Sequence, residues 1–432
     1  MSRSPEQTRE AVETVWRMEW PRLVAGLTRI VGDIDAAEEL AQDALVAALE
    51  QWPRDGVPPN PGGWLMLTAK HRAIDLVRRN QNLTRKLTLV GHELRTDQPQ
   101  QPQADGEIED DLLRMIFTAC HPVLSARARV ALTLRLVGGL TTEEIARAFV
   151  VPESTVAQRI VRAKRTIAAR HVPYEVPSGD ELARRLDSVL EVIYLIFNEG
   201  YSATAGDDWI RVELCQDALR LARMLANLLP EEPETHGLAA LLELQASRSA
   251  ARVGPAKTVV LLADQERARW DQLLIRRGFA ALGHAHTVSR NRGLPPGRYA
   301  LQAAIAAVHA MAPSSAETDW RRIAGLYAVL AERFPSPVID LNRAVAVSKV
   351  HGPAVGLELV DALVAAGALD RYHLLPAVRG DLLERLGRHD EARAEFARAA
   401  ELTGNAAEQA LLLDRMAPSD PLCAPERHPD DS

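Results

Sequence analysis

The stretch TTEEIARAFVVPESTVAQRIVRAKR, residues 141–165, predicts two short helices joined by a tight turn. Ile145, Ala146 and Phe149 share one face of the first helix. Pro152 suits the first position of the second helix, because a helix leaves the N–H at that position unpaired. Apolar residues then recur at three- and four-residue steps, which predicts a buried stripe of Val156, Ile160, Ala163 and Ile167.

The outward face of the second helix carries hydrogen-bond donors near its start and cations further along. A recognition helix of a helix-turn-helix motif reads base edges with its first side chains and holds phosphates with its basic ones. An ordinary amphipathic helix with a solvated charged face fits the same pattern, so this motif alone leaves both interpretations open. The residues on this face are Ser154, Thr155, Gln158, Arg159, Arg162, Lys164 and Arg165.

The composition predicts an all-α protein with several domains. The 432 residues suffice for two to four domains of about 100–200 residues each. Alanine, leucine and arginine dominate, aromatic residues make up only 4% of the chain, and strict alternation of apolar and polar residues is rare. The polar start MSRSPEQTRE and the lack of long apolar runs favour a soluble, cytoplasmic protein without a membrane partner.

The three cysteines indicate neither a disulfide framework nor a metal site. Cys120, Cys215 and Cys423 lie far apart, and no CxxC motif or histidine cluster accompanies them. We therefore expect no metal, no cofactor and no catalytic residue, and we interpret the isolated pair Cys120–His121 as packing.

Two basic segments stand in an acidic chain of net charge −7. Residues 63–90 carry a balance of +5 and residues 150–172 a balance of +4, which leaves −16 for the rest. Local contact with nucleic acid explains this distribution better than a general affinity for polyanions does.

Composition and periodicity divide the chain into five segments: a helical block at 5–81, a flexible Gln- and Pro-rich linker at 82–109, a second helical block at 110–172, a long helical region at 180–415 and a disordered tail at 416–432. In the first block, three helices are expected to bury apolar stripes. The stripes are Val12, Trp16, Trp20, Leu23, Leu27 and Ile30, then Leu40, Ala44, Ala48 and Trp52, and then Trp64, Leu67, Ile74 and Val77 of a helix ending at Asn80.

Two motifs carry a family resemblance. The run AEELAQDAL at 37–45, followed by W-L-x-x-x-A-x-x-x-A-I-D-x-x-R-R at 64–79, resembles region 2 of bacterial sigma factors of the extracytoplasmic-function (ECF) type in the σ70 family. Residues 140–165 resemble region 4 of the same family. The resemblance implies a region 2 helical bundle, a region 4 helix-turn-helix, and an alternative sigma factor that directs initiation by core RNA polymerase without being an enzyme.

The resemblance also implies the partners and their contacts. The helix at 35–52 would dock on the β′ clamp helices of polymerase, region 4 would read the −35 element beside the β flap, and the helix at 64–80 would read and melt the −10 element. The polymerase set is Asp35, Glu38, Glu39, Leu40, Gln42, Asp43 and Leu45, whose acidic members we expect to be exposed. The −10 set is Asn60, Trp64, Lys70, His71, Arg72, Arg78 and Arg79.

This chain departs from the family pattern at two places in region 2. Lys70-His71 stands where Arg-Asn is frequent, and Gly62-Gly63 stands where a charged or polar residue is frequent. The selectivity for −10 sequences therefore does not follow from the resemblance.

Residues 180–415 show a periodicity close to the 34-residue tetratricopeptide (TPR) repeat. Ile323, Gly356 and Ala392 occupy one register, at spacings of 33 and 36 residues. We expect a TPR-like helical-hairpin array, and segments such as 189–204 resemble an ECF subgroup with such an extension. It would modulate the sigma activity, with a regulatory protein or ligand as its partner.

The cluster Phe197, Asn198, Glu199 and Tyr201 follows an apolar run and combines aromatics with an acid. We interpret it as a hinge between the extension and the rest of the chain, with a ligand or partner site as the alternative. Two alternatives for the whole chain also stay open: a helix-turn-helix regulator acting without polymerase, and a helix-turn-helix protein whose TPR-like domain senses a metabolite.

Overall fold

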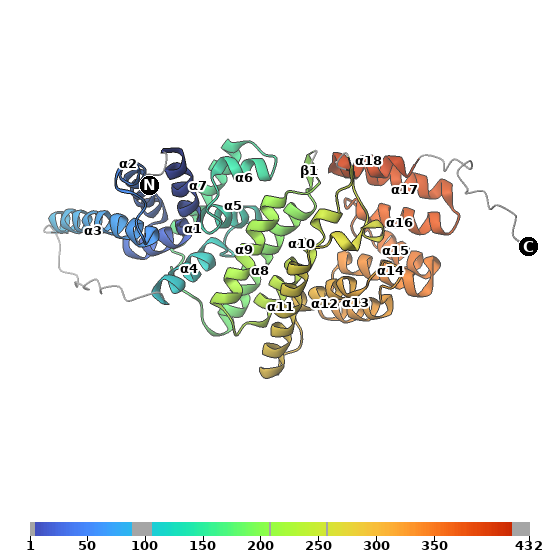
Figure 1. The fold of residues 1–432 in the computed structure, drawn as a ribbon. Coiled ribbons are helices and arrows are strands. Elements are labelled where there is room, and N and C mark those ends of the chain that lie inside the picture. Colours follow the sequence, from blue (N-terminus) through green and yellow to red (C-terminus); the bar gives the residue numbers. More distant parts are fainter. Residues whose placement is uncertain (1–4, 89–105, 207–208, 256–257, 417–432) are drawn as a thin grey trace, which may run out of the picture. The chain divides into compact units, whose positions relative to one another are not determined.

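The computed structural model describes residues 5–88, 106–206, 209–255 and 258–416, and Figure 1 shows its elements. The fold is all-α, as the sequence predicts. Strands β1 (Ala205–Gly206) and β2 (Gly404–Asn405) form a two-residue parallel pair. The chain divides into two compact units. The first unit comprises residues up to 198 with 213–235, and the second comprises 199–212 with residues from 236 onward.

The first unit is built on a bundle in which α1 packs against α2, α3 and α4. Asp33 caps α2 by accepting a hydrogen bond from the Ala36 N–H at 2.7 Å, and Gly56 ends that helix at a φ of 85°. The helices of this unit are α1 (Pro5–Val31), α2 (Ile34–Asp55), α3 (Pro61–Thr88), α4 (Gly106–Ala119), α5 (Ala126–Leu136), α6 (Thr142–Ala148), α7 (Glu153–Ala169), α8 (Gly179–Tyr201) up to residue 198, and α9 (Val212–Leu228) from residue 213.

The structure confirms the predicted stripe of α2, confirms that of α1 in part, since Trp16 and Ile30 are only half-buried, and corrects that of α3. Trp20, Leu23 and Leu27 of α1 are buried, as are Leu40, Ala44, Ala48 and Trp52 of α2. On α3, however, Leu67 is 55% exposed, and the buried residues are Leu65, Ala69 and Ala73. The prediction followed the largest apolar residues, whereas α3 packs through alanines, which allow close approach of helix backbones. The side chain of Val12 lies outside the described residues.

Helices extend into both ends of the predicted linker. α3 ends at Thr88 rather than Asn80, and α4 begins at Gly106. Residues 89–105 of that linker, residues 417–432 of the predicted tail, and Cys423 lie outside the described residues.

The opening stretch forms α6, a turn and α7. A capping box holds the start of α6, because Thr141 Oγ1 accepts from the Glu144 N–H and Glu144 Oε2 accepts from the Thr141 N–H. In the turn, Val150 has a φ of 51°. Pro152 is the residue before α7 rather than its first residue. The predicted stripe of α7 is confirmed: Val156, Ile160, Ala163 and Ile167 are buried.

The second unit is an array in which consecutive helices from α12 to α18 pack on one another (Figure 1). It contains the short helices η1 (Ser249–Ala251), η3 (Leu262–Asp264) and η4 (Arg267–Arg269). Its longer helices are α10 (Pro233–Ala246) from residue 236, α11 (Gln272–Asn291), α12 (Arg298–Met311), α13 (Trp320–Arg333), α14 (Pro337–His351), α15 (Pro353–Ala365), α16 (Leu374–Arg385), α17 (His389–Leu402) and α18 (Ala406–Asp414).

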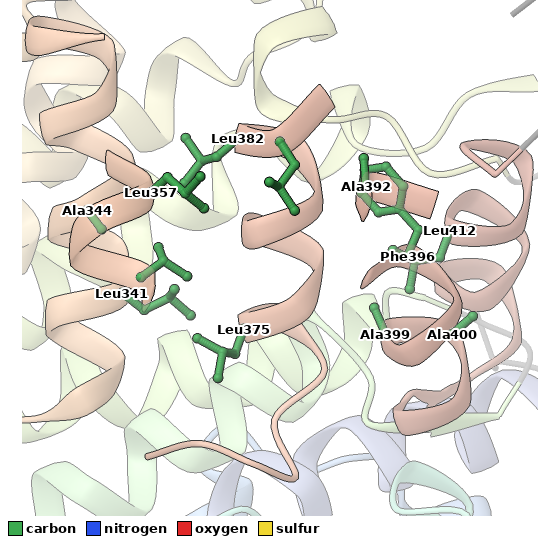
Figure 2. Packing of buried hydrophobic residues seen from close by; sticks show 12 residues of the cluster. Leu341, Ala344, Leu357, Leu375, Leu382, Ala392, Phe396, Ala399, Ala400 and Leu412 are labelled. Atoms are coloured by element: carbon green, nitrogen blue, oxygen red, sulfur yellow. The ribbon is translucent and has the colours of Figure 1, made fainter. Parts of the chain in front are cut away.

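The predicted repeat register lies on alternate helices of this array, with Ile323 on α13, Gly356 on α15 and Ala392 on α17. Two glycines of this array mark close helix packing: a Cβ on Gly356 would lie 2.5 Å from Ser348 Cβ, and one on Gly380 would lie 2.7 Å from Phe396 Cε1. Figure 2 shows the resulting core across α14–α18, which includes Leu357 and Leu382.

The buried cysteines pack as expected. Cys120 Sγ lies 3.2 Å from Thr133 Oγ1, and burial raises the pKa of its thiol to about 11. Cys215 is also buried and unbridged. Within the described ranges, no helix has the length and apolar character needed to cross a membrane.

Candidate nucleic-acid interface

The solvent face of α7 lines one side of a hollow of about 370 Å³. Thr155, Gln158, Arg159 and Arg162 line it from α7, and the segment 123–125 with Ala128 of α5 lines it from the other side. Ser154 and Arg165 are also exposed. The structure therefore brings together, on one open face, six of the seven residues that the sequence assigns to DNA.

Lys164 is the seventh, and it lies elsewhere. Its Nζ is 2.6 Å from Asp35 Oδ1 of α2 and also pairs with Glu38, and its side chain is only 11% exposed. A helix turns about 100° per residue, so Lys164 points away from the face that carries Arg162 and Arg165. In this structure Lys164 therefore cannot contact DNA.

Glu38 lies at the centre of this contact, and the prediction that it is exposed is wrong. It is 6% exposed, because Arg135 of α5 and Lys164 of α7 both pair with its carboxylate. Arg135 Nε donates to Glu38 Oε1 at 2.9 Å, and its guanidinium lies 5.0 Å from the centroid of the Trp20 ring. The carboxylate is compensated by two cations that lie far from it in sequence.

A second polar contact joins α1 to α4. The buried Asp111 carboxylate accepts from Arg29 of α1 at 2.8 Å and from Arg114 at 2.6 Å. The Tyr174 hydroxyl lies 2.9 Å from the Ala25 carbonyl and 3.0 Å from the Asp111 carbonyl, and it donates to this pair of acceptors. Burial raises the pKa of Tyr174 above its ordinary value, so the phenol keeps its proton as a donor.

The other residues assigned to polymerase occupy the rest of α2. Asp35, Glu39, Gln42 and Asp43 are exposed, Leu40 is buried and Leu45 is half-buried. Arg72 of α3 pairs with Asp43 at 3.0 Å, so one residue assigned to DNA contacts one assigned to polymerase.

The residues assigned to the −10 element lie on α3 and the loop before it. His71, Arg78 and Arg79 are exposed and Lys70 is half-buried. Asn60 Oδ1 accepts from the Gly63 N–H at 2.9 Å, at the start of α3. The Trp64 ring meets the Trp52 ring edge-on at 5.5 Å.

The two glycines that depart from the family pattern stand in crowded places. A Cβ on Gly62 would lie 2.5 Å from Glu19 Oε2, and one on Gly63 would lie 2.7 Å from Asn60 Nδ2. Larger residues there require these side chains to move.

Comparison with known proteins agrees with this geometry. The family description "Sigma-70 region 2" matches residues 16–83, "Sigma-70, region 4" matches residues 114–167, and a family of unknown function (DUF6596) matches residues 185–286. A protein of Rhizobium meliloti (strain 1021), described as uncharacterized, is 43% identical over 406 residues, which cover 92% of this chain and 94% of that relative. No solved structure matches.

Regions 2 and 4 of the sigma-70 family are both present in this chain, in that order. The chain is a sigma factor with a C-terminal extension, so its role lies in transcription initiation with core RNA polymerase and promoter DNA. Region 2 corresponds to α1–α3 and region 4 to α4–α7. The salt bridges of Glu38 and Asp111 therefore connect α1 and α2 of region 2 with α4, α5 and α7.

The extension begins with a helix that packs on region 4. Arg185 of α8 is 4% exposed and donates to the Phe117 carbonyl at 2.9 Å. Ser188 donates to the Cys120 carbonyl at 2.6 Å and accepts from Arg129 of α5, which also pairs with Glu191 at 3.1 Å. Sequence reasoning missed this contact. The recurrence of Arg185, Ser188 and Glu191 at three-residue steps along this helix was the available signal.

The predicted hinge residues lie where the two units divide. The division falls between Asn198 and Glu199, inside α8. Phe197 is fully buried on the first side of it. On the second side, Glu199 pairs with Arg211, and the Tyr201 ring lies 3.5 Å from the guanidinium carbon of Arg252.

Proposed function

We propose that this protein is an alternative sigma factor of the ECF type, in which α2 docks on the β′ clamp helices of core RNA polymerase, α3 reads and melts the −10 element, and α7 reads the −35 element beside the β flap. The observation that carries the proposal is the open face of α7, where Thr155, Gln158, Arg159 and Arg162 line one hollow. Polymerase supplies the chemistry, so this protein is not itself an enzyme. It acts in the cytoplasm, where polymerase transcribes the DNA.

Run-off transcription tests this proposal against its alternatives. The purified chain, core polymerase and the DNA upstream of its own gene are combined, and the transcript ends are mapped. A sigma factor produces discrete start sites that disappear when the chain is omitted. A regulator that acts without polymerase, or a metabolite sensor, produces no such start sites.

Removing one cation from the open face of α7 should weaken initiation. We expect Arg162→Ala to lower run-off transcription about 5- to 100-fold at limiting protein concentration, because a lost base contact costs about 1–3 kcal/mol. The effect should vanish on a template whose −35 region is scrambled. Arg277→Ala, which removes an exposed cation of α11, is the matched control and should leave transcription unchanged. Equal losses from both variants would contradict the assignment of α7.

The contacts between regions 2 and 4 add a conformational step to this proposal. The −10 and −35 elements lie about 25 base pairs apart, which is about 85 Å of duplex at about 3.4 Å per pair. Two regions that share the Glu38–Lys164 ion pair cannot reach both elements at once. We infer that these contacts open when the protein joins polymerase and promoter.

We further propose that the TPR-like extension modulates the sigma activity through α8, with a regulatory protein or ligand as its partner. The hydrogen bonds of Arg185 and Ser188 to region 4 support this route. Removing residues 180–432 would be a poor test, because α8 and most of α9 belong to the first unit. Removing a single buried contact between α8 and region 4 is a sharper test.

Ser188→Ala removes that contact with little change of shape. We expect the free energy of unfolding to fall by about 1–3 kcal/mol, because the Cys120 carbonyl loses a buried donor. Hydrogen exchange in α4 and α5 should speed up, and run-off transcription should change several-fold. Arg184→Ala, at an exposed position of α8, is the control. Faster exchange with unchanged transcription would show that α8 only supports the fold.

A further inference from the structure

Arg248, just after α10 in the second unit, is a buried cation without a counter-charge. It is 8% exposed, and its guanidinium carbon lies 5.9 Å from the centroid of the Tyr201 ring and 5.7 Å from that of Trp270. Its Nε is buried and has no hydrogen-bond partner. Among the residues that the structure describes, no carboxylate lies within ion-pair distance of this guanidinium.

A second arginine stands beside the same indole. The Arg267 guanidinium lies 4.7 Å from the Trp270 centroid and donates to the carbonyls of His309 and Ala312 and to Thr318 Oγ1. These bonds hold it in place but leave its buried Nε without a partner. Arg267 is therefore a positioned cation with one free donor.

Trp270 and His309 add further unpaired nitrogens. Trp270 Nε1 and His309 Nδ1 are both buried without a partner. Burial, together with the charges of Arg248 and Arg267, lowers the pKa of His309 to about 4. Burial and the charge of Arg248 lower the pKa of Arg267. The charges that act on these two groups are therefore those of neighbouring arginines.

Packing alone does not account for this arrangement. Stacking on aromatic rings covers the faces of a guanidinium but supplies no partner for the donors at its edge, and the Nε of Arg248 and the Nε of Arg267 are buried without one. Buried donors and charges are normally paired, because an unpaired one loses its hydration without compensation.

We propose that Arg248, Arg267 and Trp270 form a binding site for the oxyanion group, phosphate or carboxylate, of a small molecule. Arg248 would bind two oxygens through its planar fork, and the Nε of Arg267 and the indole N–H would complete the shell. His309, neutral at pH 7, would accept or donate one further hydrogen bond. Binding at this site involves neither α2, α3 nor α7, so it stands whether or not the promoter assignments hold.

Thermal unfolding of the full-length protein tests the site. Inorganic phosphate and acetate are compared with chloride at pH 7.5 and equal ionic strength. We expect at least one oxyanion to raise the Tm by about 2–4 °C, by preferential binding to the folded state. A rise with phosphate alone indicates a phosphoryl ligand, and a rise with acetate alone indicates a carboxylate. Failure of both to exceed chloride would overturn the proposal.

Arg248→Met separates a binding role from a structural one. We expect this variant to lose the rise in Tm with oxyanions and, in chloride, to unfold at the wild-type temperature or above it, because an uncompensated charge is gone. Arg277→Met, which removes an exposed cation on α11, should keep the rise. If oxyanions still raised the Tm of Arg248→Met, the proposed binding site would be wrong.

A measurement on the wild-type protein covers the case in which the variant does not fold. In NMR titrations of labelled histidines, the oxyanion that raises the Tm should shift the pKa of His309 upward, because an adjacent anion favours the imidazolium. The pKa of the exposed His286 should not move. An unchanged pKa of His309 in saturating oxyanion would show that the anion binds elsewhere.

Discussion

Glu38→Ala should lower the free energy of unfolding of the first unit by about 3 kcal/mol, because removing one member of a buried ion pair leaves the others uncompensated. This value is at the lower end of the range measured for broken buried ion pairs, because both cations keep a partner. Lys164 keeps Asp35, and Arg135 keeps its hydrogen bond to the Leu140 carbonyl. Urea unfolding followed by tryptophan fluorescence measures the loss. Trp20, which packs against Arg135, reports on this part of the unit.

The neighbouring residue supplies the control. Glu39→Ala removes an exposed carboxylate from the same helix, and its effect should stay within about 0.5 kcal/mol. A double-mutant cycle with Lys164→Ala then tests the contact itself. Residues that share a buried ion pair should show coupling of about 1–3 kcal/mol. Additive effects of Glu38→Ala and Lys164→Ala would mean that regions 2 and 4 do not make this contact in solution.

The second unit should lose stability in mild acid through His309. Its pKa in the folded protein is about 4, below the ordinary value of 6.5, so the folded state resists protonation. The stability is complete above pH 6.5 and falls as the pH drops toward 4, because the unfolded chain then binds the proton more readily. A difference of about 2.5 pKa units is worth about 3 kcal/mol, and the half-buried position of the ring reduces this to about 2 kcal/mol.

Comparison of variants separates the loss of stability caused by protonation of His309 from the loss caused by protonation of carboxylates. Urea unfolding of the wild type, His309→Gln and His286→Gln is measured at pH 7, 5.5 and 4.5. His309→Gln should lose less stability between pH 7 and 4.5 than the wild type, whereas His286→Gln, at an exposed site, should follow the wild type. Parallel curves for all three proteins would show that His309 is not held neutral in the folded state.

The contacts of α2 have a consequence for assembly with polymerase. Asp35 and Glu38 are assigned to the polymerase by the resemblance, yet both pair with Lys164 in this structure. Polymerase and region 4 would thus compete for the same carboxylates. Glu39, Gln42 and Asp43 of the same helix stay exposed.

Features that depend on residues close together in the sequence were predicted correctly, whereas features that depend on packing between helices were not. The stripe of α7 was predicted in full, because a period near 3.6 residues is a local property of one helix. The prediction of the buried face of α3 was wrong, because Ala69 and Ala73 are buried and the larger Leu67 is exposed. Small residues carry little hydrophobic signal, although they determine how closely two helices approach.

The amino-acid sequence by itself determined the all-α class, the two sigma regions and the buried stripe of α7, because these depend on composition, local motifs and periodicity. Only the tertiary structure decided which charges are compensated. Lys164 and Glu38 lie 126 residues apart, and the positive neighbourhood of Arg248 forms from Arg267 and His309 on separate elements. A carboxylate or guanidinium looks the same in sequence whether exposed or buried, and its role depends on partners that folding brings together.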